Sequence, residues 1–385
     1  MRIINQQIYN YNFNNNNFKG VRNQLAKDCL EVTGSQTKAK VFAKYVEPEA
    51  INEIKNLCNI PVFKNAPVRI MPDVSACKDC VVGFSAIVPK DKIKDVPPNI
   101  IGNDIGCGVL LVKTDAKLDN LNLKKIDNFI KSELFTNKNL RPEMSRGLKQ
   151  NVVESCKLFD KDEKRILDQS GTLGNGNHFI EIDADDEQNI YLSIHTGSRQ
   201  YGSYIKEYYE NALKGEKDAP RDISYSDAVK MAQSYAKFNR KSIANMILNK
   251  FKLKSVMEYD CPHNYISDEG IVHKGSIDAE KGKPVLIPLN MRDGIILGKG
   301  KGNTDWNYSA PHGAGRKLSR FEARTNINVD DYKKSMKGIY SSVVGKRTLD
   351  EAPQAYKDSN DTIDIIKDTV DIETVIKPVY NYKKH

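Results

Sequence analysis

Four of the six histidines lie in turns rich in glycine and asparagine. They are His178 in GNGNHF, His195 in IHTGSR, His263 in CPHNYI and His312 in PHGAGR. Such turns allow close approach of the backbone to a ligand and hold a side chain rigidly at the end of a strand, which packing alone does not explain. We expect these imidazoles to be functional. His273 and His385 have no such setting and are expected at the surface.

An acidic residue and a cysteine extend this set. Asp104 and Cys107 lie three residues apart in NDIGCG, where a tight turn lets a carboxylate and a thiolate converge. With His178, His195 and His263 they form a candidate metal site. Taken alone, each of the five is explained equally well as a buried residue with a purely structural role. That explanation does not account for all five in similar turns. Among the candidate metals, zinc is favoured because thiolate and imidazole are soft ligands. A thiolate can also bridge two metal ions, and paired ions are common in enzymes that transfer phosphoryl groups.

His312 stands apart because PHGAGRKLSR also contains Arg316 and Arg320. A neutral imidazole is a competent nucleophile toward phosphorus, and arginines bind phosphoryl oxygens bidentately. A metal ligand and a phosphate-binding donor are the alternative roles of His312.

Two other motifs are weaker. Cys77 and Cys80 form a C-x-x-C, which suits a redox pair or half of a zinc site, but no second C-x-x-C follows. Lys78 between them would contact phosphate or be solvated. GKGKGN at 298–303 resembles a phosphate-cradling loop but lacks the spacing of a P-loop.

Strand-like and helical segments must position these residues. Apolar, β-branched runs broken by turn residues predict strands within 38–113, near 178–182 and 189–197, and within 284–320. Residues 118–170 are predicted to be helical, and the longest helix is predicted at about 226–251. Asn239 and Arg240 flank its apolar stripe and are interpreted as boundary residues. The sequence indicates an α+β protein with one domain at 38–385, after a lead-in at 1–37 that contains an Asn-rich tract.

Composition narrows the class of protein. The chain has 385 residues, of which 39% are hydrophobic, and this excludes disorder as its overall state. The net charge of +9 suits a polyanionic partner such as nucleic acid. The N-terminus does not resemble a signal peptide, and no apolar stretch approaches the roughly 20 residues that span a bilayer. Seven cysteines argue against a disulfide framework. We expect a cytoplasmic protein with reduced thiols and no membrane contact.

Six motifs, taken in order, resemble the RtcB family of RNA ligases. They are MPDVSACKDCVVGFSA (71–86), IIGNDIGCGV (100–109), GTLGNGNHFIEI (171–182), HTGSRQYG (195–202), HN (263–264) and APHGAGRKLSR (310–320). The resemblance implies an RtcB-like domain of mixed sheets with surrounding helices. It also implies a GTP- and Mn²⁺-dependent ligase that joins RNA 3′-phosphate or 2′,3′-cyclic phosphate ends to 5′-hydroxyl ends. Such a ligase would act in RNA repair or tRNA splicing, with or without an accessory protein.

The resemblance also implies a role for each residue. His312 would take GMP covalently, and two Mn²⁺ ions would replace the zinc that softness favours. The ligands would be Asp104, Cys107, His178, His195 and His263, with Cys107 bridging. Guanylate contacts would fall on Asn177, Glu181, Gly315, Tyr356 and Lys383, and RNA phosphate contacts on Arg199, Arg316 and Arg320.

Three positions depart from the family pattern. Ser75 and Asp79 replace a histidine and a glycine, and Asn290 replaces a serine within Pro288–Met291. These changes leave two other hypotheses open. One is a dinuclear metal-dependent phosphoesterase or nuclease that acts on RNA ends with water as the nucleophile. The other is an RNA-end-binding protein without ligase chemistry.

Overall fold

The computed structural model describes residues 29–77, 80–216 and 223–384. Most of the 1–37 lead-in, including its Asn-rich tract, lies outside these residues, as do Lys78, Asp79 and His385. Within the described ranges, no helix is both long enough and apolar enough to cross a membrane.

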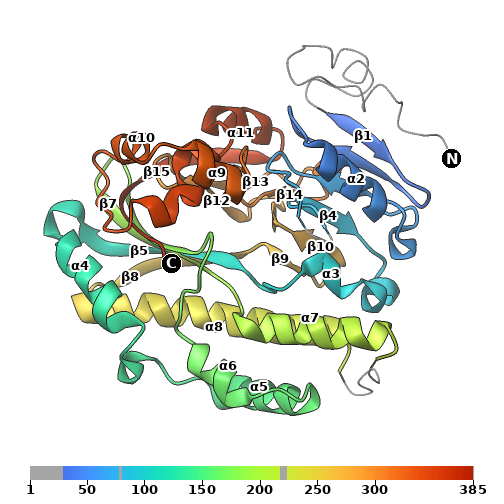
Figure 1. Cartoon of the computed structure of the whole chain (residues 1–385), viewed down its shortest axis with the longest axis horizontal. Coiled ribbons are helices and arrows are strands. Elements are labelled where there is room, and N and C mark those ends of the chain that lie inside the picture. The colour runs from blue at the N-terminus through green and yellow to red at the C-terminus, as the bar shows by residue number, and fades with distance from the viewer. Residues whose placement is uncertain (1–28, 78–79, 217–222, 385) are drawn as a thin grey trace.

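Two large sheets carry the site (Figure 1). The first, whose neighbouring strands are all antiparallel, has the order β12 (Pro284–Asn290), β13 (Gly294–Gly300), β15 (Val370–Tyr382), β6 (Phe179–Ala184), β7 (Asn189–Thr196), β5 (Gly108–Lys117) and β8 (Ser255–Pro262). The second is mixed, with the order β1 (Leu30–Thr33), β2 (Lys38–Val41), β3 (Val68–Ile70), β4 (Phe84–Ile87), β10 (Ile271–Lys274) and β9 (Asn264–Ile266). A short ribbon of β11 (Ser276–Asp278) and β14 (Ser309–Pro311) leads to His312.

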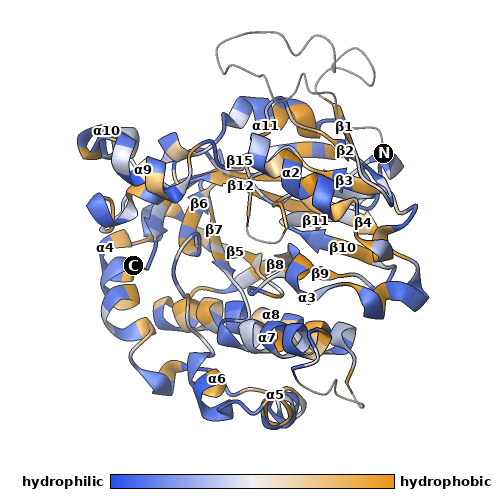
Figure 2. Ribbon diagram, turned by 45° about the vertical axis from the view of Figure 1, so that its right-hand side comes forward, coloured by the Kyte–Doolittle hydropathy of each residue, from blue (hydrophilic) through white to orange (hydrophobic). Residues whose placement is uncertain are grey.

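Helices cover the sheets on two sides. In Figure 1, α7 (Gln200–Leu213) and α8 (Tyr225–Phe251) run beneath the strands, and α5 (Arg146–Leu158) and α6 (Glu163–Gln169) lie below them. The opposite side holds α9 (Arg320–Asn326), α10 (Val329–Ser335) and α11 (Ser359–Ile366). The others are α2 (Pro48–Leu57), α3 (Pro98–Ile101) and α4 (Leu123–Phe129). Figure 2 shows long hydrophobic stretches in the strands and largely hydrophilic residues in the peripheral α4 and α5. The α+β prediction is confirmed.

Helix α8 connects two hydrophobic cores. Its first half contributes Ala228, Val229, Ala232 and Tyr235 to the core that also contains the six-stranded sheet. Its second half contributes Ile243, Ala244, Met246, Ile247 and Leu248 to the core on the seven-stranded sheet. The helix begins at a Ser224 cap and ends at Lys252, close to the predicted limits of 226 and 251.

Asn239 and Arg240 lie between these two cores, and their interpretation as boundary residues is wrong. Both are fully buried, at 0% and 1% exposed. Arg240 forms a bidentate ion pair with Asp260, from Nε to Oδ1 at 2.6 Å and from Nη2 to Oδ2 at 2.8 Å. Its Nη1 donates to the carbonyls of Gly106 and Thr196. A buried guanidinium is tolerated here because each of its nitrogens has an acceptor.

His273 is a second correction, because it is buried rather than at the surface. It lies on β10, between β4 and β9, and stacks on Tyr265 with ring centroids 4.6 Å apart. Its Nδ1 hydrogen-bonds with the Ser276 hydroxyl at 3.0 Å. A lone histidine in the sequence did not reveal that its strand would be an inner one.

The GKGKGN segment also has a structural role. Residues 298–300 belong to β13, and a side chain at Gly300 would collide with the backbone of Ala279. The glycines therefore permit close packing of backbone, and Lys299 pairs with Glu373 across the sheet.

Replacing Arg240 tests how much its buried ion pair and hydrogen bonds stabilise the protein. Arg240→Met leaves Asp260 and two carbonyls without their donor, and we expect it to lower the free energy of unfolding by about 3–5 kcal/mol. The control is Lys241→Met, which removes an exposed ion pair with Glu258 and should cost less than about 1 kcal/mol. Urea unfolding measures both. Equal stability of the two variants would show that the buried ion pair is dispensable.

Candidate active site

The pairing of four strands brings distant residues to one edge of the sheet. Val109 pairs with His195 and with Cys261, and Phe179 also pairs with His195. Because these pairs are antiparallel, the starts of β5 and β6 lie beside the ends of β7 and β8. Cys107, His178, His195 and His263 occupy those four strand ends, so the register itself assembles the cluster.

Three of these side chains form a tight group of metal-ligand type. The Sγ of Cys107 lies 3.5 Å from Nε2 of His178 and 3.3 Å from Nε2 of His195. The donor atoms of the three residues all lie within 4.8 Å of one another. The Nδ1–H of His178 donates to the carbonyl of Leu173 at 2.9 Å, which leaves its Nε2 lone pair facing the group.

Asp104 indicates that this group is built for a cation. Its Oδ2 lies 2.9 Å from the Nε2 of His178, and its buried Oδ1 has no hydrogen-bond partner among the described residues. The carboxylate fits against Gly197, where any side chain would collide with it. Facing acceptors and an orphaned carboxylate oxygen fit a bound divalent metal ion, which would supply the missing charge.

Burial keeps the imidazoles of His195 and His263 neutral. It lowers the pKa of His195 and of His263 well below the usual value, with further lowering from neighbouring histidines. Neutral imidazoles retain the lone pairs that a metal ion requires. Burial and the Asp104 carboxylate raise the pKa of the Cys107 thiol, so a metal ion binding there must displace a proton.

His263 lies between the metal-donor group and His312. Its ring centroid is 5.2 Å from that of His195 and 4.6 Å from that of His312. Its backbone is fixed on both sides, because its N–H donates to Cys107 and its carbonyl accepts from Gly275. The four histidines thus form one continuous row of rings.

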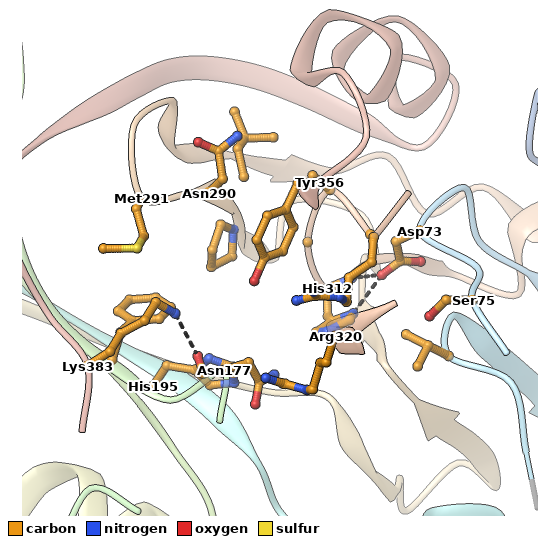
Figure 3. Close-up of a pocket in the computed structure, with 18 of the residues that line it drawn as sticks. Asp73, Ser75, Asn177, His195, Asn290, Met291, His312, Arg320, Tyr356 and Lys383 are labelled. Atoms are coloured by element: carbon orange, nitrogen blue, oxygen red, sulfur yellow. Dashed lines mark hydrogen bonds and ion pairs between the residues drawn. The ribbon is translucent and has the colours of Figure 1, made fainter. Parts of the chain in front are cut away.

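Asp73 orients His312. The Nδ1–H of His312 donates to Oδ2 of Asp73 at 2.6 Å and to the carbonyl of Gly275 at 2.9 Å. Since Nδ1 carries the proton in this arrangement, Nε2 keeps its lone pair, and Figure 3 shows this edge of the ring facing the cavity. Asp73 is completely buried and was not singled out from the sequence, although it lies in the MPDV motif.

A second buried contact holds the Asp73 loop in place. The ammonium of Lys357 donates to the carbonyls of Pro72 and Val74, at 2.9 and 2.8 Å. Burial lowers the pKa of Lys357 to about 8, against the opposing effect of Asp73. Gly315 allows this close fit because a side chain there would lie 2.6 Å from the Asp73 backbone.

The cavity beside His312 has a volume of about 370 Å³. Predicted guanylate residues line it: Asn177, Glu181, His312, Gly315, Tyr356 and Lys383. Arg316, Arg320 and His195 line it too, and Figure 3 shows several of these side chains converging. Arg199 is not among the lining residues; it begins α7, and its Nε lies 3.4 Å from the Thr172 hydroxyl.

Glu351 organises the wall opposite the metal-donor group. Its Oε2 accepts from Lys383 at 2.9 Å and from the Tyr356 hydroxyl at 2.7 Å. Its Oε1 pairs with Arg320 at 2.8 Å and with Arg316 at 3.3 Å. Burial alone would raise the pKa of Glu351, but Lys383 and Arg320 dominate and hold it at about 2. The sequence reasoning missed this residue.

Comparison with known proteins identifies the family. The family model described as tRNA-splicing ligase RtcB matches residues 138–384. The chain belongs to the RtcB family. It is 26% identical over 405 residues to the RNA-splicing ligase RtcB of Escherichia coli strain K12, covering 90% of this chain and 98% of that protein. It is also 26% identical over 450 residues to the tRNA-splicing ligase RtcB of Methanococcus maripaludis, covering 89% and 92%.

Membership of the RtcB family confirms the resemblance and makes two departures informative. Asn290 lines the cavity, but its Oδ1 accepts from the N–H groups of Arg292 and Asp293, and its Nδ2 donates to Asp293. The amide therefore closes its own turn. Ser75 also lines the cavity, whereas Asp79 lies outside the described residues.

The C-x-x-C cysteines have different surroundings. Cys77 is exposed and lines the cavity, whereas Cys80 is buried and its thiol contacts the carbonyl of Val81. All seven cysteines are free thiols in the structure.

Glu351 makes acid stability a test of this site. A carboxyl whose pKa falls from 4.5 to about 2 on folding contributes about 3 kcal/mol of stability above pH 4.5, and this is lost as the pH falls through 2. We expect Glu351→Gln to be less stable than wild type by roughly this amount at about pH 7, with the gap narrowing below pH 4.5.

Urea unfolding across this pH range measures the effect. Glu373→Gln, which removes an exposed ion pair with Lys299, is the control and should change stability by less than about 1 kcal/mol. A Glu351→Gln gap that does not change with pH would contradict the assignment of an ionised, paired Glu351.

Proposed function

We propose that this chain is an RNA ligase that joins a 3′-phosphate or 2′,3′-cyclic phosphate end to a 5′-hydroxyl end, using GTP and Mn²⁺. The observation that carries the proposal is His312, whose Nδ1–H is bound by Asp73 and whose Nε2 faces a cavity beside a cluster of metal-ligand type. The names of the relatives, RNA-splicing and tRNA-splicing ligase, support the same reaction class. RNA repair and tRNA splicing would both use this chemistry.

His312 has the features of a nucleophile toward phosphorus. In the proposed first step, its Nε2 forms a bond with the α-phosphorus of GTP while the bond to the β-phosphate oxygen breaks and pyrophosphate leaves. The imidazole becomes cationic, and the Asp73 carboxylate at Nδ1 stabilises that charge. A hydrogen bond of 2.6 Å from a buried carboxylate also fixes the ring orientation before GTP binds.

The second and third steps transfer GMP and then release it. An oxygen of the RNA 3′-phosphate would attack the phosphorus, break the P–N bond and regenerate neutral His312. The 5′-hydroxyl would then attack the activated 3′-phosphate, and GMP would leave. Negative charge on phosphoryl oxygens develops in each step, and Arg316 and Arg320 line the same cavity. Arg199 would act from the metal side.

The guanylate would occupy the 370 Å³ cavity, whose size suits a nucleotide. Lys383 and Tyr356 would contact it from positions fixed by Glu351, with Asn177, Glu181 and Gly315 completing the wall. Because Asn290 uses its amide within its own turn, its contribution here would be structural.

The metal ions would be held by Asp104, Cys107, His178, His195 and His263. Cys107 would contribute its thiolate, and its sulfur lies 3.5 Å and 3.3 Å from the Nε2 atoms of His178 and His195. Bound Mn²⁺ would polarise phosphoryl oxygens and offset their charge. Thiolate and imidazole donors also suit zinc, so we expect Zn²⁺ to compete for the site.

Intact-mass measurement after incubation with GTP and Mn²⁺ tests the proposed nucleophile. We expect an acid-labile GMP adduct on wild type and none on His312→Ala. Asp73→Asn, which keeps the shape but removes the charge, should slow adduct formation by about 100-fold or more. Lys92→Gln, at an exposed residue, is the control. RNA-end cleavage without GTP and without any adduct would instead support the phosphoesterase hypothesis.

Equilibrium dialysis with Mn²⁺ tests the metal site independently of activity. We expect Cys107→Ala to weaken Mn²⁺ binding by at least about tenfold. Cys261→Ala is the matched control, since Cys261 is also a buried thiol on a neighbouring strand but is not part of the donor group. Equal weakening by both substitutions would assign the effect to a general loss of packing.

A further inference from the structure

A second hollow lies next to the cavity and is strongly cationic. Its volume is about 650 Å³, and five cationic side chains line it with one carboxylate, that of Asp350. We call these five residues the basic groove: Arg320, Arg324, Lys346, Arg347 and Lys384. None of the roles given above involves Arg324, Lys346, Arg347 or Lys384.

The basic groove adjoins the cavity beside His312. Arg320 lines both hollows. The loop before His178 separates them, because Asn177 faces the cavity whereas Asn175 and Gly176 face the groove. On its far side, Arg324 and Lys346 also line a third hollow of about 550 Å³ at the end of α9 and start of α10. A ligand that leaves the cavity past Arg320 would therefore meet a row of cations.

The charges of the basic groove are only partly neutralised within the chain. Asp350 pairs with Arg320 and Arg324, at 2.8 and 3.1 Å. Lys346 and Arg347 are exposed, and no carboxylate of the described residues lies in ion-pair contact with either. Two adjacent unpaired cations repel each other, and a polyanion would relieve that repulsion.

We propose that the basic groove binds the sugar-phosphate backbone of one RNA strand, at the nucleotides next to its reactive end. This inference rests on the proposed ligase function and deepens it. Several cations beside a reactive cavity suit the repeated negative charges of a nucleic-acid backbone, and such contacts hold a strand without reading its sequence. The contribution of Lys346 and Arg347 would thus be to RNA binding and not to the reaction of His312 with GTP.

The test compares Lys346→Gln/Arg347→Gln with Lys92→Gln/Lys94→Gln. The control removes two exposed lysines from the 3₁₀ helix Lys90–Asp95, which does not line the groove. Both variants should form the GMP adduct at the wild-type rate. With RNA strands of about ten nucleotides, the groove variant should raise the KM for RNA roughly tenfold. Its salt dependence of RNA binding should be shallower by about 1.4 in log–log slope.

Strand length provides a second readout. The 3′-phosphate strand and the 5′-hydroxyl strand are shortened to a dinucleotide one at a time. Only shortening the strand that occupies the groove should abolish the difference between the groove variant and wild type, so the result identifies that strand. If the adduct forms but the groove variant binds and ligates long RNA like wild type, the proposal is overturned, and an acidic segment of another protein becomes the better occupant. If wild type forms no adduct, the proposed function itself fails.

Discussion

The arrangement of the site depends on the polar junction between two hydrophobic cores on α8. Arg240 binds the carbonyls of Gly106 and Thr196, and Asn239 binds those of Thr172 and Gly197. These carbonyls belong to three turns that adjoin Cys107, His178 and His195. Burying a guanidinium costs several kcal/mol unless its partners are well placed, so the pairing tolerates few alternative arrangements. The turns that carry the candidate metal ligands are therefore fixed to one helix before any ligand binds.

Electrostatics divides the cavity into two unlike halves. On one side, burial keeps His195 and His263 neutral, and Asp104 has a buried carboxylate oxygen without a hydrogen-bond partner among the described residues. On the other side, Glu351 is ionised because Lys383, Arg316 and Arg320 surround it. His312 lies between these halves, and Asp73 orients its ring. The proposed nucleotide would suit this arrangement. Its phosphates would bind the cationic side chains and the proposed metal ions, and its base would bind fixed polar groups.

Sequence reasoning singled out residues that adjoin Gly- or Asn-rich turns, but not residues whose partners lie on distant segments. Cys107, His178, His195, His263 and His312 were recognisable because each adjoins a Gly- or Asn-rich turn. Asp73 gave no comparable signal, since its meaning depends on His312, which lies 239 positions away. Arg240 was misjudged because helical periodicity places it near the apolar stripe but does not reveal Asp260 or the two carbonyls that make its burial favourable. Lys357 and Glu351 likewise acquire roles only through tertiary contacts.

The seven-stranded sheet depends on β15, the last strand in the sequence. This strand comes late in the sequence but is an inner strand, paired with β13 on one side and β6 on the other. Lys383 follows directly after it, and Asn381 within it binds Glu181. A chain that ended before Val370 would contain every proposed metal ligand and His312. The edges of β6 and β13 would be open, however, and the cavity beside His312 would lack Lys383. During synthesis, the pair β12–β13 and the group β6–β7–β5–β8 therefore become one sheet only after this last strand has been made.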